Sequence, residues 1–420
     1  MARRSIAIVA LCLAGCGAKT GLYVPDADAQ APPDVMDAGI LDAGPDVDIC
    51  VEVPLDGGPI QVELEVEAEV GSADITFLID VTASMGEEID RIRSRLRDQL
   101  SPAIDEAIPD SQLAVATFAD FPVRGYGNAG AGDNPFELRL PMTTDLSQVQ
   151  AAVNAINLGD GADIQESQVE ALFQLATGAG RGTYVPPAAG CPMGGVGYAC
   201  MRRDAFPIVL LFTDADFHNG PRGAFPYSTG DIVPAPATYD QAVAALNALG
   251  MVVIGFDSGE GAASDHLRAV ARDTGAIADG RPLVFDIGSR GQRLGTQVVS
   301  AIQTFASSVE QDIDAIFLDG DPSDGLDATD FVESVRPVRA DPADGVSEID
   351  FEAGVFRDAR AGTVLTWEIT VFNDAVVPGP TARRVRLEII FRGDARRRLK
   401  RIFVDIVIPG EDGSGCEELF

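Results

Sequence analysis

An aspartate and two hydroxyl residues follow an apolar run in the first quarter of the chain. The segment Phe77-Leu-Ile-Asp80-Val-Thr82-Ala-Ser84 places a carboxylate at the end of a predicted strand and hydroxyls two and four residues later, before a predicted helix. In an open α/β sheet, ligands bind at the carboxyl ends of the strands. A carboxylate with nearby hydroxyls and room for water suits a hard cation such as Mg²⁺. The alternative is that Thr82 or Ser84 caps the helix, which would explain one of these residues but not all three.

The pattern Asp80-x-Thr82-x-Ser84 resembles the metal-ion-dependent adhesion site of von Willebrand factor type A domains, with Thr in place of the commoner first Ser. In that family two further loops complete the site. The sequence Thr-Asp-Ala-Asp-Phe-His at 213–218 is similar to the family's Thr-Asp loop, above all to its integrin β version. The resemblance implies that Asp214 is a second carboxylate of the metal site, either bound directly to the ion or placed just behind the direct ligands.

The remaining loop of the family also has a counterpart. Most type A domains offer a threonine there, whereas integrin β subunits offer Asp-Ser-Pro-Glu. Asp163-Ile-Gln-Glu166 is similar to the integrin version and implies that Glu166 binds the metal, with Asp160 or Asp163 as the next candidates. Integrin β domains hold a second cation beside the first, and the resemblance implies Glu87, Glu88 and Asp163 as ligands for it.

The elements that must position these residues alternate between strands and helices. Apolar runs typical of buried strands occur at 74–79, 112–118, 207–213 and 251–256, with shorter strands expected at 136–140 and 283–287. Apolar stripes at helical spacing predict helices over 87–107, 147–156, 165–177, 239–249, 263–273 and 291–312. This alternation predicts an α/β fold, a doubly wound and mostly parallel sheet with helices on both faces, over residues 72–312.

The segments on either side of this domain alternate apolar and polar residues, as half-buried strands do. Such runs occur at 60–70, 364–372, 384–391 and 401–408. We therefore predict an antiparallel β-sandwich made of residues 50–71 and 313–420, into which the α/β domain is inserted. Between the last two runs, Arg392-Gly393-Asp394 is predicted to be a hairpin turn. The basic residues of 396–401 are either a solvated hairpin tip or a contact for the acidic domain.

Four cysteines remain outside the first sixteen residues, and they allow three disulfide pairings. Cys191 and Cys200 are close in sequence within a Gly/Pro-rich loop and should pair locally, beside the metal face. That leaves Cys50 to pair with Cys416. A zinc site is the alternative, but nothing resembles a CxxC motif and the chain has only 2 histidines.

The N-terminus has the pattern of an export signal. Two arginines precede a short apolar stretch that ends in Leu-Ala-Gly-Cys16, which resembles a bacterial lipobox. The resemblance implies that residues 1–15 are a signal peptide and that Cys16 is lipidated; a plain secretory signal is the alternative. Residues 16–49, rich in Asp, Ala and Pro, predict an acidic disordered tether. The expected location is the bacterial outer membrane, on its periplasmic face or the cell surface, with the lipid as the anchor.

The net charge and the motifs of the chain indicate which classes of partner and activity to expect. A net charge of −34, from 65 acidic against 31 basic residues, argues against nucleic-acid partners. Nothing resembles a nucleophile elbow, and we expect the protein not to be an enzyme. The resemblance implies a cell-envelope lipoprotein whose type A domain binds Mg²⁺, Mn²⁺ or Ca²⁺ and, through the ion, a protein or other carboxylate-bearing ligand. The alternatives are a structural envelope protein with a purely stabilising metal and, less favoured, a hydrolase.

Overall fold

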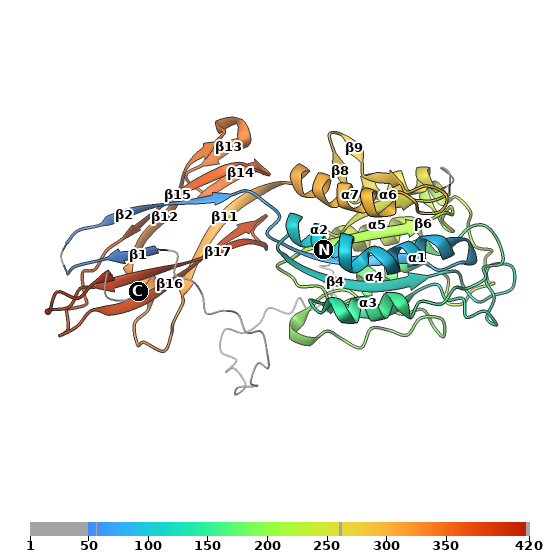
Figure 1. The fold of residues 1–420 in the computed structure, drawn as a ribbon, viewed down its shortest axis with the longest axis horizontal. Coiled ribbons are helices and arrows are strands. Elements are labelled where there is room, and N and C mark those ends of the chain that lie inside the picture. The colour runs from blue at the N-terminus through green and yellow to red at the C-terminus, as the bar shows by residue number, and fades with distance from the viewer. Residues whose placement is uncertain (1–48, 56, 260–262, 417–420) are drawn as a thin grey trace, which may run out of the picture. The chain divides into compact units, whose positions relative to one another are not determined.

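The computed structural model describes residues 49–55, 57–259 and 263–416 (Figure 1). The predicted signal peptide, Cys16 and nearly all of the predicted tether lie outside these residues. Among the helices of the described part, none combines the length and the apolar character needed to cross a membrane. The described residues form an α/β domain and a β-sandwich, and each has its own hydrophobic core.

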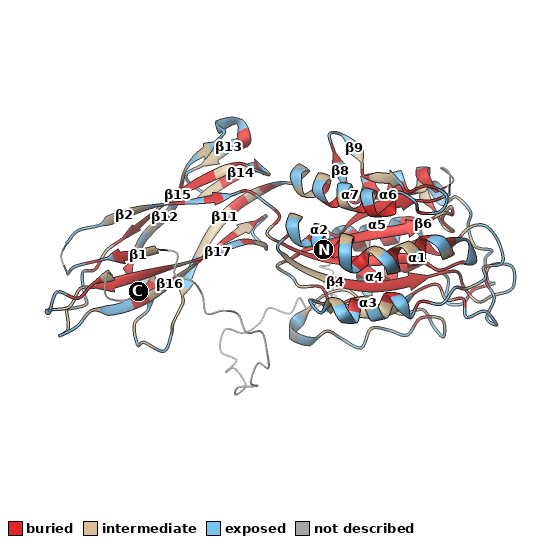
Figure 2. Cartoon of the chain, viewed as in Figure 1, coloured by how far each residue is buried: buried red, intermediate tan, exposed pale blue. Residues whose placement is uncertain are grey.

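A six-stranded sheet forms the centre of the α/β domain. Its order is β10-β7-β6-β3-β4-β5, and all neighbouring strands are parallel except β4 and β5. The central strands are buried along their whole length (Figure 2), as expected when both faces of a parallel sheet are covered. The strands are β3 (Ser72–Asp80), β4 (Asp110–Phe118), β5 (Glu137–Thr143), β6 (Phe206–Thr213), β7 (Val252–Asp257) and β10 (Val284–Asp286).

Helices cover both faces of this sheet. Successive residues of β3 point to opposite faces, so that Phe77 and Ile79 join one core and Leu78 the other. On the first face lie α1 (Gly86–Arg95), α2 (Ser101–Ala107), α3 (Leu146–Asn154) and α7 (Leu294–Ser308). On the second lie α4 (Gln168–Thr177), α5 (Tyr239–Leu249) and α6 (Ser264–Asp273). The predicted α/β class, doubly wound and mostly parallel, is confirmed.

The β-sandwich packs a six-stranded sheet, β1-β17-β16-β11-β14-β13, against a three-stranded sheet, β12-β15-β2, around the buried Trp367. Strands β1 and β2 precede the α/β domain in the sequence, whereas their partners β17 and β15 follow it. The α/β domain is therefore inserted in the sandwich. The strands are β1 (Ile49–Glu52), β2 (Ile60–Glu67), β11 (Glu310–Asp319), β12 (Val332–Asp341), β13 (Glu348–Asp350), β14 (Val355–Arg360), β15 (Val364–Val371), β16 (Arg383–Gly393) and β17 (Arg397–Ile408).

The sandwich differs from the sequence prediction in three ways. Strand β1 pairs parallel with β17 in an otherwise antiparallel sheet. Helix α7 ends at Ser308, short of the predicted residue 312, because the chain becomes the strand β11 from Glu310. Strands β11 to β14 lie where no strand was predicted. Their alternation is weak, and β12 carries Pro337 beside a bulge.

Both predicted disulfides are present. Cys50 of β1 is bonded to Cys416, which follows β17, across a sequence separation of 366 residues. Cys191 is bonded to Cys200 across a separation of 9. The first disulfide therefore joins the two ends of the described chain within the sandwich, and the second closes a short loop of the α/β domain.

The loop closed by the second disulfide does not lie beside the metal face, so that part of the prediction is wrong. Arg202, just after this loop, donates hydrogen bonds to Asp74 and Asp110, which stand near the starts of β3 and β4. These are the amino ends of the strands, whereas the predicted metal ligands follow the carboxyl ends. The reason is that α4 first carries the chain along the sheet by about 15 Å.

The start of β17 contacts the α/β domain, which is the second of the two roles predicted for the basic residues of 396–401. Arg398 pairs with Asp110 at 2.5 Å. The guanidinium of Arg397 lies 3.7 Å from the ring centroid of Phe206. Strand β16 runs to Gly393, so the hairpin turn comprises residues 394–396 and not the predicted 392–394. Arg392 pairs with Asp314, and Asp394 pairs with Arg397.

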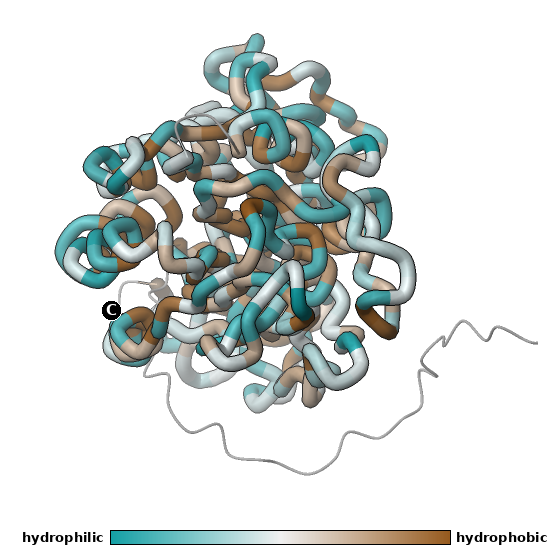
Figure 3. Tube along the Cα trace, turned by 90° about the vertical axis from the view of Figure 1, so that its right-hand side faces the viewer, coloured by the Kyte–Doolittle hydropathy of each residue, from teal (hydrophilic) through white to brown (hydrophobic). Residues whose placement is uncertain are grey.

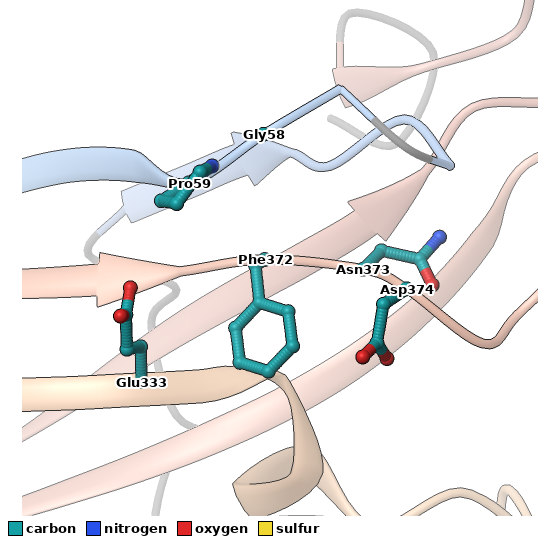
Figure 4. A pocket seen from close by; sticks show the side chains of 6 residues that line it. All are labelled: Gly58, Pro59, Glu333, Phe372, Asn373 and Asp374. Carbon is teal, nitrogen blue, oxygen red and sulfur yellow. The ribbon is translucent and has the colours of Figure 1, made fainter.

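A cavity of about 340 Å³ opens in the sandwich, beside the starts of β2 and β12 and the end of β15. Figure 4 shows its lining: Gly58, Pro59, Glu333, Phe372, Asn373 and Asp374. The lining holds two carboxylates and no basic group, and the side-chain amide of Asn373 already donates to two backbone carbonyls. We assign this cavity no ligand.

Candidate metal centre

Asp80 is the centre of the site predicted from the sequence. It ends β3 and is fully buried. Its Oδ1 accepts hydrogen bonds from the backbone N (3.0 Å) and Oγ1 (2.7 Å) of Thr82, whose Oγ1 lies 3.2 Å from Oγ of Ser84. Thr82 stands at the cap position of the following helical turn but makes no side-chain capping bond. Capping therefore does not explain these hydroxyls, which are bonded to the carboxylate and to each other.

The end of β6 and the loop after it supply a third hydroxyl and a second carboxylate. Oγ1 of Thr213 donates to Oδ2 of Asp80 at 2.7 Å, and Nε2 of Gln168 donates to Oγ1 of Thr213 at 2.9 Å. Asp214 accepts a hydrogen bond from Ser84. Sequence reasoning named Asp214 but missed Thr213, although its place directly before Asp214 was a usable signal. It also missed Gln168, which no local pattern marks because its contact is tertiary.

Glu166 brings a third loop to the same place. Its backbone N donates to the carbonyl of Asp216 at 3.1 Å, and its carbonyl accepts from the backbone N of His218 at 2.8 Å. The residue is 4% exposed, and its Oε2 has no hydrogen-bond partner among the described residues. A β-carbon on Gly161 would lie 3.1 Å from Oε1, so the loop fits closely around the carboxylate. Asp160, the alternative ligand, instead accepts from an asparagine side chain.

The carboxylates of this site lack neighbouring positive charge. Burial, with repulsion from Asp214, raises the pKa of Asp80 to about 7. Burial, with repulsion from Asp80 and Asp120, raises the pKa of Glu166 to about 11. Burial also raises the pKa of Asp214. In the described part of the chain, no Arg or Lys forms an ion pair with Asp80, Glu166 or Asp214. A bound cation would supply the missing charge.

The donor set fits a hard divalent cation. Mg²⁺ takes oxygen ligands, typically one or two carboxylates, and keeps several waters. The three loops bring together the carboxylate and hydroxyl oxygens of the five predicted residues, and one buried carboxylate oxygen is left without a partner. These residues are Asp80, Thr82, Ser84, Glu166 and Asp214.

The residues predicted for a second cation divide between two places. Glu88 is buried, its carboxylate oxygens have no hydrogen-bond partner among the described residues, and burial raises its pKa to about 7. Glu87, beside it, is exposed. Asp163 has other neighbours, His218 at 3.0 Å and Asp120. The structure therefore groups Asp163 with two residues that sequence reasoning did not assign to a cation.

Similarity to known proteins is found among solved structures. No protein-family model matches the sequence, and no curated protein matches it. The chain is similar to a von Willebrand factor type A protein from Catenulispora acidiphila, with 11% identity and a TM-score of 0.37, over 86% of this chain and 72% of that one. It is also similar to the pilus adhesin SpaC from Lactobacillus rhamnosus GG in its open conformation, with 12% identity and a TM-score of 0.32, over 85% and 46%. A third similar structure is proximal thread matrix protein 1 from the mussel byssus, with 15% identity and a TM-score of 0.32, over 57% and 47%. The chain spans about half the length of the last two.

The raised pKa values predict how stability depends on pH when cations are removed. Asp80 would titrate near its ordinary value of about 4 in the unfolded chain and at about 7 in the folded one, so the folded state holds the extra proton between these values. The free energy of unfolding should therefore fall as the pH rises from about 4 to about 7. Bound Mg²⁺ would neutralise the Asp80 carboxylate in place of that proton, so in Mg²⁺ the free energy of unfolding should not fall over this pH range. Thermal unfolding of chelator-treated protein between about pH 5 and 8, with and without Mg²⁺, measures this; equal falls in both conditions would contradict it.

Proposed function

We propose that the α/β domain is a von Willebrand type A-like module that binds Mg²⁺, or Mn²⁺ or Ca²⁺ in its place, and through the ion a carboxylate of a partner. The observation that carries the proposal is the group formed by the buried Asp80 and Glu166 and the partly buried Asp214. It lies beside the hydroxyls of Thr82 and Ser84 and lacks a basic partner among the described residues. An ion held by hydroxyls and few carboxylates retains affinity for a further anion. A carboxylate on the partner would supply it.

The surroundings of the site favour a protein as the partner. Large apolar side chains are exposed on the loops of this edge: Leu158 at 44%, Ile164 at 77% and Phe225 at 42%. Leu158 lies 3.2 Å from a β-carbon position on Gly86, at the start of α1, and Ile164 is two residues before Glu166. Figure 3, which turns this end of the α/β domain toward the viewer, shows hydrophobic and hydrophilic residues interleaved along the trace. Apolar groups beside a polar anchor are typical of protein interfaces.

The proposal extends to the location and class of the protein. Two disulfides are typical of proteins in oxidising compartments, which supports export. From the pattern around Cys16 we propose an outer-membrane lipoprotein that acts by binding and not as an enzyme. Turnover of ester, phosphate or peptide substrates by the purified protein would contradict the proposal that it acts by binding and not as an enzyme.

Retention of cell-envelope proteins on the immobilised mature chain tests the binding function. Partners should be retained in Mg²⁺ and released by EDTA. Equal retention in both conditions would reject a metal-bridged contact. The Asp80→Ala variant separates this function from a purely structural metal, because a structural metal predicts lower thermal stability with partner binding intact.

Glu166→Gln should weaken cation binding about tenfold or more, because a charged contact contributes about 1.5–3 kcal/mol. Glu166→Thr, which restores the commoner family residue, should keep a weaker but functional site. Calorimetric titration of Mg²⁺ and Mn²⁺ into the three proteins measures the dissociation constants. Asp160→Asn, whose side chain bonds an asparagine, is the matched control and should bind as the wild type does. An unchanged constant in Glu166→Gln would show that the third ligand is another residue.

A further inference from the structure

His266, in the first turn of α6, contacts the loop that follows β6. Its Nδ1 accepts a hydrogen bond of 2.9 Å from the backbone N of Phe217. The imidazole is 12% exposed and packs edge-on against the ring of Phe217, with the ring centroids 5.3 Å apart. A β-carbon on Gly220 would lie 2.8 Å from the imidazole, so the loop fits closely around it. The function proposed above gives this histidine no role.

The loop that His266 contacts is part of the candidate metal centre. It carries Asp214, three residues before Phe217. The backbone of Glu166 bonds to the loop on either side of Phe217, through the carbonyl before it at 3.1 Å and through the N–H after it at 2.8 Å. The N–H of Phe217 itself points the opposite way, toward α6. The loop is therefore bonded to Glu166 along one side and to His266 along the other.

The hydrogen bond from Phe217 determines which nitrogen of the imidazole is protonated. A backbone N–H can only donate, so Nδ1 of His266 carries no proton and the neutral ring has its proton on Nε2. Oδ1 of Asp216 lies 3.4 Å from the same Nδ1, beyond the usual hydrogen-bond range of about 2.7–3.2 Å. Burial lowers the pKa of His266, against the charges of Asp216 and Asp265, and so favours the neutral ring. The imidazole thus acts as an acceptor for the loop backbone.

Given the cation-binding function proposed above, we propose that His266 is a positioning residue of the candidate metal centre. Its unprotonated Nδ1 holds the loop after β6 so that Asp214 and the backbone bonds to Glu166 keep the arrangement that receives the cation. Replacement of a residue just behind the ligands typically lowers metal affinity by about 10–100-fold. His266 acts through the loop backbone and not on a ligand side chain, so we expect an effect at the lower end of that range.

Calorimetric titration of Mg²⁺ into chelator-treated protein tests the role of the acceptor. His266→Leu has no acceptor and should bind Mg²⁺ about tenfold more weakly than the wild type. His266→Asn places an amide oxygen near the position of Nδ1 and should bind within about threefold of the wild type. This rescue separates loss of the acceptor from loss of the imidazole. Arg268→Gln is the control, because Arg268 lies on the same helix but is half-exposed and pairs with Asp265; it should bind as the wild type does.

The variants of His266 should fold. The ring of Phe217 is fully buried in the core on the α6 face of the sheet and keeps the loop attached to the domain. Far-ultraviolet circular dichroism checks this. His266→Gln, whose longer side chain carries its amide to the position of Nε2, replaces His266→Leu if the latter does not fold, and it should bind Mg²⁺ as weakly. Hydrogen exchange of the Phe217 amide, followed by NMR, should be faster in His266→Leu and His266→Gln than in the wild type and unchanged in His266→Asn.

The outcomes separate this role of His266 from the cation-binding function itself. Equal affinity for Mg²⁺ in the wild type and His266→Leu would overturn the inference and leave the proposed function intact. Equal losses in His266→Leu and His266→Asn would do the same, because the imidazole would then act by its packing alone. Absence of Mg²⁺ binding by the wild type would overturn both the inference and the proposed function.

Discussion

Asp80→Asn should lower the affinity for Mg²⁺ by about a hundredfold or more, the largest effect expected of a single substitution in this protein. Asp80 is fully buried and its carboxylate is the one to which two of the three loops are hydrogen bonded. Asparagine keeps the shape and one carbonyl oxygen, so the loss reports the charge. A hundredfold change corresponds to about 2.7 kcal/mol, within the range for a buried charged contact. Calorimetric titration of Mg²⁺ into chelator-treated protein measures it.

The same substitution should have the opposite effect on stability when cations are absent. Without a metal, the wild type must keep Asp80 protonated or hold its charge beside Asp214 in a buried place. Asp80→Asn removes that cost, so at about pH 8 in EDTA it should unfold a few degrees above the wild type. In Mg²⁺ the order should reverse, because the ion stabilises the wild type alone.

Asp257→Asn is the matched control for both measurements. Asp257 ends β7 at the same edge of the sheet and is 2% exposed. Its two oxygens already accept from the backbone N of Gly259 and from the hydroxyl of Ser264. We expect the affinity of the Asp257→Asn variant for Mg²⁺ to stay within about threefold of that of the wild type. A variant Asp80→Asn that binds Mg²⁺ normally, or that melts below the wild type in EDTA, would show that the carboxylates are not held together by a cation.

Removal of the Cys50–Cys416 disulfide should destabilise the sandwich by up to about 4–5 kcal/mol in the chain-entropy model. The bond closes a loop of several hundred residues and ties β1 to the end of the chain. The chain has 1 tryptophan, Trp367, and it is fully buried in the sandwich core, so its fluorescence reports the unfolding of that part. The double variant Cys50→Ser/Cys416→Ser should shift the tryptophan transition to lower denaturant concentration.

Loss of the Cys50–Cys416 disulfide should not change the affinity of the protein for cations. The ligands of the candidate centre belong to the α/β domain, which has its own two cores. The Mg²⁺ affinity of the double variant should therefore match that of the wild type. The variant Cys191→Ser/Cys200→Ser is the control for loss of a disulfide as such, because its loop spans only 9 residues and should cost less. Equal shifts of the Trp367 transition in the two variants would contradict the prediction that the Cys50–Cys416 disulfide stabilises the sandwich more than the Cys191–Cys200 disulfide does.

What could be predicted from the sequence was encoded locally. Helix α5 has the predicted bounds because Thr238 forms a complete capping box and Gly250 ends the helix in the left-handed conformation. The first loop of the site was predictable in the same way, from an aspartate and two hydroxyls spaced along one short segment. Both features need no knowledge of distant residues.

The features of the fold and of the site that could not be predicted from the sequence depend on contacts between distant segments. The bridge between Glu166 and the loop after β6, and the meeting of Asp163 with Asp120 and His218, follow from the folded sheet and leave no local pattern. The spacing of Ile313, Ile316 and Phe317 suits a helix as well as a strand, and only pairing with β16 decides for the strand. Sequence reasoning extended α7 to residue 312, although the helix ends at Ser308, and it grouped Asp163 with Glu87 and Glu88, whereas Asp163 lies beside Asp120 and His218.

The insertion of one domain into another sets an order of events when the protein is made. Strand β2 leaves the ribosome about 300 residues before its partner β15, a delay of roughly 15–60 s at usual rates of translation. During that time β2 is an unpaired strand, open to wrong partners. Its alternate residues Glu63, Glu65 and Glu67 are exposed carboxylates, whose mutual repulsion opposes the stacking of such strands from different nascent chains. The acidic face of β2 thus opposes such mispairing until its partner β15 is made. The pairing of β1 with β17 and the oxidation of Cys50 with Cys416 come later still.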